Sequence, residues 1–208
     1  MSKNERVMVF PRSVLEKIGV FQGLNFDWEK YFNPIMSQDV IRFKHRNEVE
    51  EDPSFKQIIP YVIIESGGNI LHYTRGKKSG EKRLVSKASI GIGGHVSDVD
   101  DSMFHNKNSL MSDIYGAAVE REVFEEINIE STCQKEIVAV LNDDSDPVGQ
   151  VHFGVIHLWR LKEPVVTKRE QQITQLEFMK PDELLNHSDS LENWSSICVE
   201  NLKLILQY

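Results

Sequence analysis

The stretch Ala117 to Ile129 reads Ala-Ala-Val-Glu-Arg-Glu-Val-Phe-Glu-Glu-Ile-Asn-Ile and has the apolar spacing of a helix that packs against a sheet. Glu122, Glu125 and Glu126 fall at i, i+3 and i+4, so on a helix they share one face, with Cβ atoms roughly 5–6 Å apart. Asn128 suits the left-handed position that ends many helices. The predicted helix therefore carries its acids in its last turns.

This placement of the acids is unfavourable without a partner. The C-terminal end of a helix is the negative end of its dipole, where an acid costs about 0.3–1 kcal/mol. Glu122 and Glu126 also repel each other at i, i+4, by roughly 0.2–0.5 kcal/mol. A sequence that breaks local rules in this way usually has a compensating ligand. We expect a divalent cation.

The composition is that of an acidic globular protein. The chain has 208 residues, 40% of them hydrophobic and 27% charged, with a formal net charge of −8. This length accommodates one compact domain with an extension, and the negative charge argues against nucleic acid as the main partner. Cys133 and Cys198 lack the spacing of a metal site or a disulfide framework, which favours a reducing compartment.

The chain has no recognisable targeting or membrane segment. Its first residues lack the apolar core of a signal peptide, and no apolar run approaches the ~20 residues of a membrane span. We therefore expect a cytoplasmic protein without a membrane partner.

Apolar periodicity and turn residues predict the remaining elements. We expect an α/β (α+β) fold in which a mixed sheet is covered by helices on both faces. Pro60 argues that the first strand begins at a sheet edge. The expected strands are 58–65, 70–74, 84–92, 136–141, 151–161 and 175–179, and the expected further helices are 13–21, 182–185 and 190–207.

Residues 1–55 are less regular and rich in aromatic side chains. We expect them to form an extension that packs on a main domain of residues 56–208. A cap over one edge of that domain is the simplest role. A role in gating substrate or in forming a homodimer is the alternative.

The loop at 75–83 is basic. It contains Arg75, Lys78 and Arg83 together with two further lysines. Such charge runs at hairpin tips are usually just solvated, but on an acidic chain this loop is the best candidate for binding a phosphate-bearing substrate.

Two glycines end the strand expected at 84–92, where residues 93–96 read Gly-Gly-His-Val. Paired glycines mark a turn, and they also allow close approach to the backbone and leave carbonyl oxygens available to a ligand. His95 beside them could contact a phosphate or make a structural hydrogen bond.

In these two motifs the chain resembles the Nudix hydrolase family. The family signature is Gly, five residues, Glu, seven residues, then Arg-Glu-aliphatic-x-Glu-Glu-x-Gly-aliphatic. Residues 121–129 read Arg-Glu-Val-Phe-Glu-Glu-Ile-Asn-Ile and match the second half at every position but one, and Gly93-Gly94 looks like its start. The resemblance covers roughly residues 56–185 and implies a Nudix-type mixed sheet sandwiched between helices.

The chain departs from the signature in its spacing. Asn128 replaces the glycine near the helix end, and the early glutamate falls on Asp113. Eighteen residues instead of five separate Gly94 from Asp113. We interpret this as an insertion at 95–112, between the glycines and the helix, that shapes substrate entry.

The resemblance implies a metal site. Glu122 and Glu126 would be the main ligands of Mg²⁺ or Mn²⁺, Glu125 would share a second ion, and Gly93 would add its carbonyl oxygen. Clustered carboxylates without nearby cysteine suit these hard cations. The ions would neutralise a pyrophosphate and lower the pKa of an attacking water.

The resemblance also implies roles for other charged residues. Arg121 would orient a glutamate through a charge-assisted hydrogen bond, with a surface ion pair as the alternative. The general base would be Glu125, or Glu163 or Glu170 from a later loop.

Together these features predict a Mg²⁺- or Mn²⁺-dependent hydrolase of the pyrophosphate bond in a nucleoside diphosphate linked to another moiety. The alternative is a module of the same fold that binds or senses a nucleotide without turnover. Isomerisation of an isoprenyl diphosphate would need a cysteine near the site, and neither Cys133 nor Cys198 is obviously placed for it.

Overall fold

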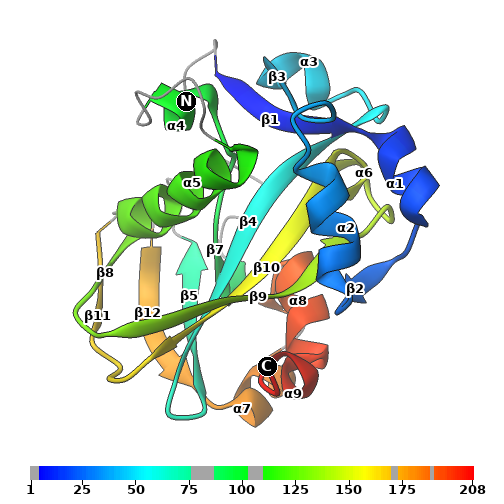
Figure 1. Cartoon of the computed structure of the whole chain (residues 1–208). Coiled ribbons are helices and arrows are strands. Elements are labelled where there is room, and N and C mark those ends of the chain that lie inside the picture. The colour runs from blue at the N-terminus through cyan, green and yellow to red at the C-terminus, as the bar shows by residue number, and fades with distance from the viewer. Residues whose placement is uncertain (1–4, 76–86, 103–109, 170–172, 188–189) are drawn as a thin grey trace. The chain divides into compact units, whose positions relative to one another are not determined.

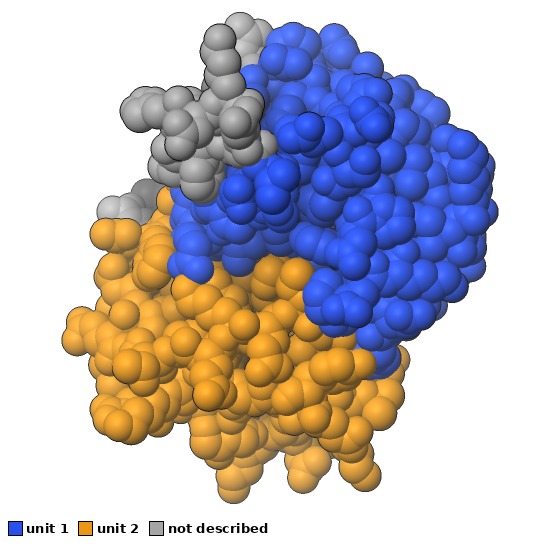
Figure 2. Space-filling view, viewed as in Figure 1, with its two compact units in different colours: residues 1–60, 93–121, 139–156 blue, residues 61–92, 122–138, 157–208 orange. Residues whose placement is uncertain are grey.

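The computed structural model describes residues 5–75, 87–102, 110–169, 173–187 and 190–208. The chain divides into two compact units, each assembled from three separate segments (Figure 2). Unit 1 comprises residues 1–60, 93–121 and 139–156, and unit 2 comprises residues 61–92, 122–138 and 157–208.

Long strands run through both units, and shorter ones belong to a single unit. The strands that enter both, labelled in Figure 1, are β4 (Phe55–Ser66), β9 (Cys133–Asn142) and β10 (His152–Leu161). Unit 1 adds β2 (Gly23–Asn25), and unit 2 adds β5 (Asn69–Arg75) and β12 (Ile173–Met179). Among the described residues these strands follow the order β12-β5-β4-β10-β9-β2 in one sheet. The predicted α/β architecture is confirmed.

Unit 1 contains the N-terminal segment, which is paired into the sheet. Its β1 (Arg6–Pro11) runs antiparallel to β3 (Arg42–His45) and to the start of β4, and β2 pairs with the end of β9. Val7, Val9 and Val49 form a buried cluster against Phe55. The helices of this unit are α1 (Arg12–Ile18), α2 (Trp28–Ile35), α3 (Arg46–Val49), α4 (Asp98–Ser102) and α6 (Pro147–Val151).

Unit 2 contains the hairpin of β4 and β5 and the C-terminal helices. β12 and β6 (Ala88–Ser89) pair with β5, β7 (Gly91–Ile92) pairs with β4, and β8 (Ile127–Ile129) pairs with β11 (Val166–Lys168). The helices are α7 (Pro181–Asn186), α8 (Asn193–Glu200) and α9 (Leu202–Ile205). No helix among the described residues is long and apolar enough to cross a membrane.

The sheet-edge interpretation of Pro60 is wrong. β4 has β5 and β10 as neighbours in the strand order. Residues 55–57 of β4 pair with β1, and residues 62–63 pair with β7. Pro60 lies between these two partners, so its missing N–H falls where the flanking strand changes.

Two helix boundaries also differ from the prediction. α1 ends at Ile18 rather than at residue 21 because Gly19 adopts a φ of 125°, which ends the helix. The single helix expected over 190–207 begins at Asn193 instead, and it is divided into α8 and α9 at Asn201. The strand predicted at 84–92 lies partly outside the described residues, and its described end forms β6 and β7.

Candidate functional site

The acidic residues lie on α5 (Met111–Glu126), a helix that runs through both units. Its apolar side chains are buried, including Ile114, Ala118 and Val123. The acids that follow differ in exposure: Glu122 is half-buried, Glu125 is exposed, and Glu126 retains 8% of its surface. The predicted helical spacing of the acids is confirmed.

The helix ends at Glu126, so Glu125 and Glu126 lie in its last turn as predicted, but the predicted left-handed cap at Asn128 is wrong. α5 passes directly into β8, and Asn128 lies opposite Thr167 in the antiparallel pair of β8 and β11. Gln175 is the described non-glycine residue with a positive φ, so Asn128 is not left-handed. Strand pairing, rather than a left-handed cap, directs the chain out of the helix.

Arg169 caps the C-terminal end of α5. Its backbone N–H donates to the carbonyl of Glu126 at 2.9 Å, and its Nη1 donates to the carbonyl of Phe124 at 2.7 Å. A cation at this end of a helix is worth typically about 0.3–1 kcal/mol. Arg169 therefore supplies part of the positive charge that offsets the acidic last turn of α5. Sequence reasoning missed Arg169 because residues 163–174, between two expected strands, read only as a polar connection.

Arg121 joins α5 to the turn that follows the glycines. Its guanidinium donates from Nε to Asp100 Oδ1 at 2.7 Å and from Nη2 to Asp100 Oδ2 at 3.0 Å. Nη2 also lies 3.0 Å from the carbonyl oxygen of His95. Asp100 is completely buried and accepts a third hydrogen bond from the backbone N–H of Ser97, at 2.8 Å. The ion pair thus fixes the backbone of residues 95–100 against the helix.

Sequence reasoning missed Asp100 and matched the early acid of the signature to Asp113, an assignment that stays a prediction. Asp113 is exposed and accepts a hydrogen bond from the backbone of Leu110 at 3.2 Å, so it caps the start of its own helix. Five residues separate Gly94 from Asp100, as in the first interval of the signature, but twenty instead of seven separate Asp100 from Arg121. The Ser97-x-x-Asp100 capping pattern was the available signal.

His95 is held by neighbours within unit 1. Its Nε2 lies 2.9 Å from Gln57 Oε1, and its ring centroid lies 5.5 Å from that of His152. Burial, with smaller effects of Arg46 and His152, lowers the pKa of His95 well below its ordinary value. The structural hydrogen bond is present, and a contact with phosphate stays a prediction.

The other predicted residues are placed as follows. Gly93 directly follows β7, as expected for the turn. Arg75 ends β5 opposite Ile173. Glu163 is exposed, and its backbone donates to Ser131 Oγ at 2.9 Å. Lys78, Arg83 and Glu170 lie outside the described residues. Cys133 is half-buried and Cys198 is buried, both as free thiols.

Among the described side chains, no group of three or more histidine, cysteine, aspartate or glutamate residues is arranged to hold an ion. The donors on the acidic face of α5 are nevertheless all carboxylate oxygens, the type that Mg²⁺ and Mn²⁺ prefer. The chemistry of the donor set fits these ions.

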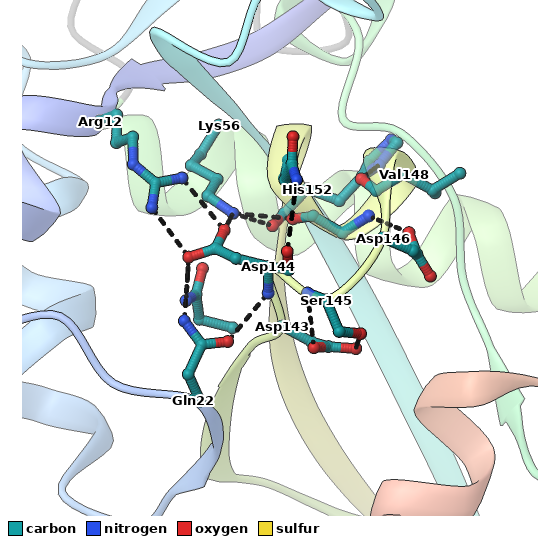
Figure 3. A network of polar contacts seen from close by, with 12 residues as sticks. Arg12, Gln22, Lys56, Asp143, Asp144, Ser145, Asp146, Val148 and His152 are labelled. Atoms are coloured by element: carbon teal, nitrogen blue, oxygen red, sulfur yellow. Dashed lines mark hydrogen bonds and ion pairs between the residues drawn. The ribbon is translucent and has the colours of Figure 1, made fainter.

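A second network of charges holds the N-terminal segment in unit 1 (Figure 3). Asp144 accepts hydrogen bonds from Arg12 at 3.0 and 2.8 Å, from Gln22 at 2.9 Å and from Lys56 at 2.7 Å. Burial alone would raise the pKa of Asp144, but these donors outweigh it and hold the pKa well below its ordinary value. This network binds Arg12 and Gln22 to the loop after β9.

Lys56 is the buried centre of that network. Its ammonium has no exposed surface and also donates to the carbonyls of Gly149 at 2.7 Å and His152 at 3.2 Å. Burial lowers the pKa of Lys56, and Asp144 opposes that effect.

Comparison with known proteins locates the chain in a family. No family model matches it. Protein YmaB of Bacillus subtilis (strain 168) is 32% identical over 212 residues, which cover 96% of this chain and 98% of that protein. Among solved structures, Tm1382, described as a candidate Nudix hydrolase, is 28% identical with a TM-score of 0.78, and the match covers 98% of this chain and 100% of that one.

A more distant structure shares the fold alone. The NUDIX domain of Shewanella oneidensis NrtR, solved with ADP ribose, is 11% identical with a TM-score of 0.53, and the match covers 73% of this chain and 88% of that domain. The matches to YmaB and Tm1382 span nearly the whole chain, so they include the N-terminal segment. The chain belongs to the same family as Protein YmaB of Bacillus subtilis, and its fold is that of the Nudix hydrolases.

Proposed function

We propose that this protein is a Mg²⁺- or Mn²⁺-dependent hydrolase that cleaves the pyrophosphate bond of a nucleoside diphosphate linked to another moiety. The observation that carries this proposal is the acidic face of α5 in a chain with the Nudix hydrolase fold. The helix is fixed near this face by Arg121 and at its C-terminal end by Arg169.

Glu122 and Glu126 are the proposed main ligands of the ion, with Glu125 and the carbonyl of Gly93 as further donors. When bound, a divalent ion would neutralise phosphate charge and lower the pKa of a water molecule. The partial burial of Glu122 and Glu126 supports their selection, because a desolvated carboxylate interacts more strongly with a cation than an exposed one does.

Arg121 and Asp100 have a positioning role in this proposal. Their ion pair sets the rotation of the helix one residue before Glu122, and the bond to His95 sets the backbone two residues after Gly93. Positioning matters because the protein contributes to phosphoryl transfer mainly by orienting groups and stabilising charge.

Glu125 is our candidate general base. It is exposed on α5, so its carboxylate can reach solvent water and accept a proton. Glu170 and Glu163, from the later loop, are the other candidates, and Glu163 is likewise exposed.

A nucleotide-type substrate is proposed on two grounds. The structurally similar NrtR domain was solved with ADP ribose. This chain, with a net charge of −8, also needs local positive charge to hold a diphosphate. We assign that role to Arg75, Lys78 and Arg83, with His95 as a further contact. A cytoplasmic location and participation of residues 1–55 in a homodimer stay predictions.

The proposal is tested by incubating the purified protein with nucleotide sugars, dinucleoside polyphosphates, dinucleotides and nucleoside triphosphates. Each substrate is combined with Mg²⁺ or Mn²⁺, and products are separated by chromatography. We expect cleavage that requires the ion and is abolished by a chelator. Glu126→Gln should lower kcat/KM at least about 100-fold, which is a loss of about 3 kcal/mol of transition-state stabilisation.

Glu130→Gln is the matched control, because Glu130 is an exposed acid just beyond β8. It should retain activity, and circular dichroism should show that both variants are folded. Full activity of Glu126→Gln would overturn its assignment as a ligand. Ion-dependent nucleotide binding without product after long incubation would replace the hydrolase by the alternative, a non-catalytic nucleotide-binding module.

A further inference from the structure

We propose that the start of helix α8 positions the strand that leads into the Gly93 turn, through four side chains that we call the hydroxyl cluster. Its members are Tyr61, Ser89, Glu192 and Ser195, all in unit 2. The inference rests on the proposed function, because it concerns the backbone that would present the Gly93 carbonyl. It assigns the C-terminal part of the chain a role in that site.

Ser195 is the centre of the hydroxyl cluster. Its Oγ lies 2.7 Å from the hydroxyl of Tyr61 and 3.2 Å from Ser89 Oγ. It also accepts a hydrogen bond from the backbone N–H of Ile90 at 3.1 Å. Ser89 and Ser195 have no exposed surface. One buried hydroxyl on α8 therefore contacts Tyr61 on β4, the side chain of Ser89 and the backbone of Ile90.

Glu192, at the N-cap of α8, fastens the same segment by backbone and side chain. Its N–H donates to the carbonyl of Ala88 at 2.9 Å, and its Oε1 accepts from Ser89 Oγ at 2.5 Å. Tyr61 OH lies 3.4 Å from the same oxygen. An isolated bridge between Ala88 and Leu191 continues the contact.

Gly91, two residues after Ser89, is enclosed by side chains in and beside the hydroxyl cluster. A Cβ atom at this position would overlap the ring of Tyr61, so only glycine fits. Its carbonyl accepts from the hydroxyls of Tyr73 at 2.9 Å and Ser89 at 3.0 Å. Residues 88–91 are thus held at every position, and Gly93 follows two residues later.

The polar character of these contacts indicates that the hydroxyl cluster positions the backbone of residues 88–91, and does not only fill space. Apolar side chains would occupy the same volume without fixing the register of the strand. A satisfied network of buried hydrogen bonds specifies one arrangement of its backbone partners. Misplacement of a catalytic group by about 1 Å can lower a rate roughly 100-fold. The hydroxyl cluster therefore acts on the proposed site through the backbone, without touching the reacting atoms.

The test compares two identical substitutions of buried serines. Ser195→Ala removes the central hydroxyl of the cluster, whereas Ser66→Ala removes a buried hydroxyl that donates to the Leu161 carbonyl at 3.2 Å in the same unit. Hydrogen–deuterium exchange of peptides spanning 88–94 is measured without substrate. The Mn²⁺ concentration for half-maximal hydrolysis, KM and the midpoint of thermal unfolding are measured alongside.

We expect both alanine variants to lower the unfolding midpoint to a similar extent. Ser195→Ala alone should accelerate exchange at 88–94 at least about fivefold and raise the Mn²⁺ requirement by a similar factor, with a smaller change in KM. Tyr61→Phe removes only a hydroxyl and should produce the same changes at a lower level, so it serves as the second variant if Ser195→Ala does not fold.

Equal exchange and equal Mn²⁺ requirement in the Ser195 and Ser66 variants would overturn the inference. The exchange measurement does not depend on turnover. If the wild-type protein hydrolyses no substrate of the panel, the proposed function fails while accelerated exchange still supports the hydroxyl cluster as the device that holds residues 88–94.

Discussion

Units 1 and 2 each contain a buried polar network, and the two networks differ in chemistry. In unit 1 Lys56 and Asp100 have no exposed surface and form ion pairs with Asp144 and Arg121. In unit 2 the hydroxyl cluster consists mainly of neutral donors that surround one carboxylate.

The difference matters because losing one partner has unequal consequences. Breaking a buried ion pair leaves an uncompensated charge and costs about 3–5 kcal/mol. Losing a neutral hydrogen bond costs about 0.5–1.5 kcal/mol. Both networks join segments far apart in sequence: Arg12 meets Asp144 in unit 1, and Tyr61 meets Ser195 in unit 2. They differ in what a lost partner leaves behind, so we infer that unit 1 loses more stability than unit 2 when one polar partner is removed.

The largest expected effect is that of Lys56→Met. The substitution keeps an apolar stem but removes the ammonium that neutralises Asp144 and binds the Gly149 and His152 carbonyls. We expect a loss of about 3–5 kcal/mol in the free energy of unfolding, measured with a chemical denaturant. Lys162→Met, at an exposed position, should change stability by less than about 0.5 kcal/mol. A loss below about 1 kcal/mol for Lys56→Met would remove the contrast between the units.

Two glycines sharpen the comparison at the level of backbone packing. A Cβ atom on Gly149 would overlap the backbone carbonyl of Asp143 in unit 1, whereas one on Gly91 would overlap the Tyr61 side chain in unit 2. Each substitution by alanine should cost about 3 kcal/mol, since overpacking forces the surroundings to move.

Only the second overlap can be relieved by another substitution. Adding Tyr61→Leu to Gly91→Ala should make the double variant more stable than the sum of the single effects predicts, in a double-mutant cycle measured by denaturation. At Gly149 the obstacle is the backbone carbonyl of Asp143, which no second substitution can remove. Strict additivity at Gly91 and Tyr61 would show that the ring is not the obstacle.

The smallest expected effects distinguish the acids Asp100 and Asp113. Asp100→Asn leaves Arg121 with a neutral partner in a buried position and should cost about 2 kcal/mol. It should also lower hydrolysis about tenfold. Asp113→Asn alters an exposed cap and should cost about 0.5 kcal/mol with activity retained. Denaturation and initial rates give both values. Greater sensitivity at Asp113 would favour Asp113 over Asp100 as the early acid of the signature.

The sequence was sufficient where a pattern is local. The helix that carries the acids follows from the spacing of Glu122, Glu125 and Glu126. The strands near 58–65 and 151–161 follow from largely apolar, β-prone runs. In each case neighbouring residues determine the element, so no distant information is needed.

The sequence was insufficient where distant charges meet. Arg121 finds Asp100 across 21 positions, and Arg169 reaches back 45 positions to Phe124. Lys56 can be buried because its ammonium donates to Asp144, 88 residues later, and to the carbonyls of Gly149 and His152. The local sequence around a lysine at the start of an apolar strand does not indicate such a partner. The left-handed end proposed for Asn128 failed for a similar reason, because β11 supplies a strand partner that local preference does not reveal.

The pairing of β1 and β2 has a practical consequence for shortened chains. β1 covers the start of β4, and β2 covers the end of β9. A chain that begins at residue 56 would lose both partners and Arg12, and would present unpaired N–H and C=O groups along two strands. Exposed strand edges of this kind template association with other chains. We therefore expect a chain that lacks the first 55 residues to aggregate more readily than the full chain.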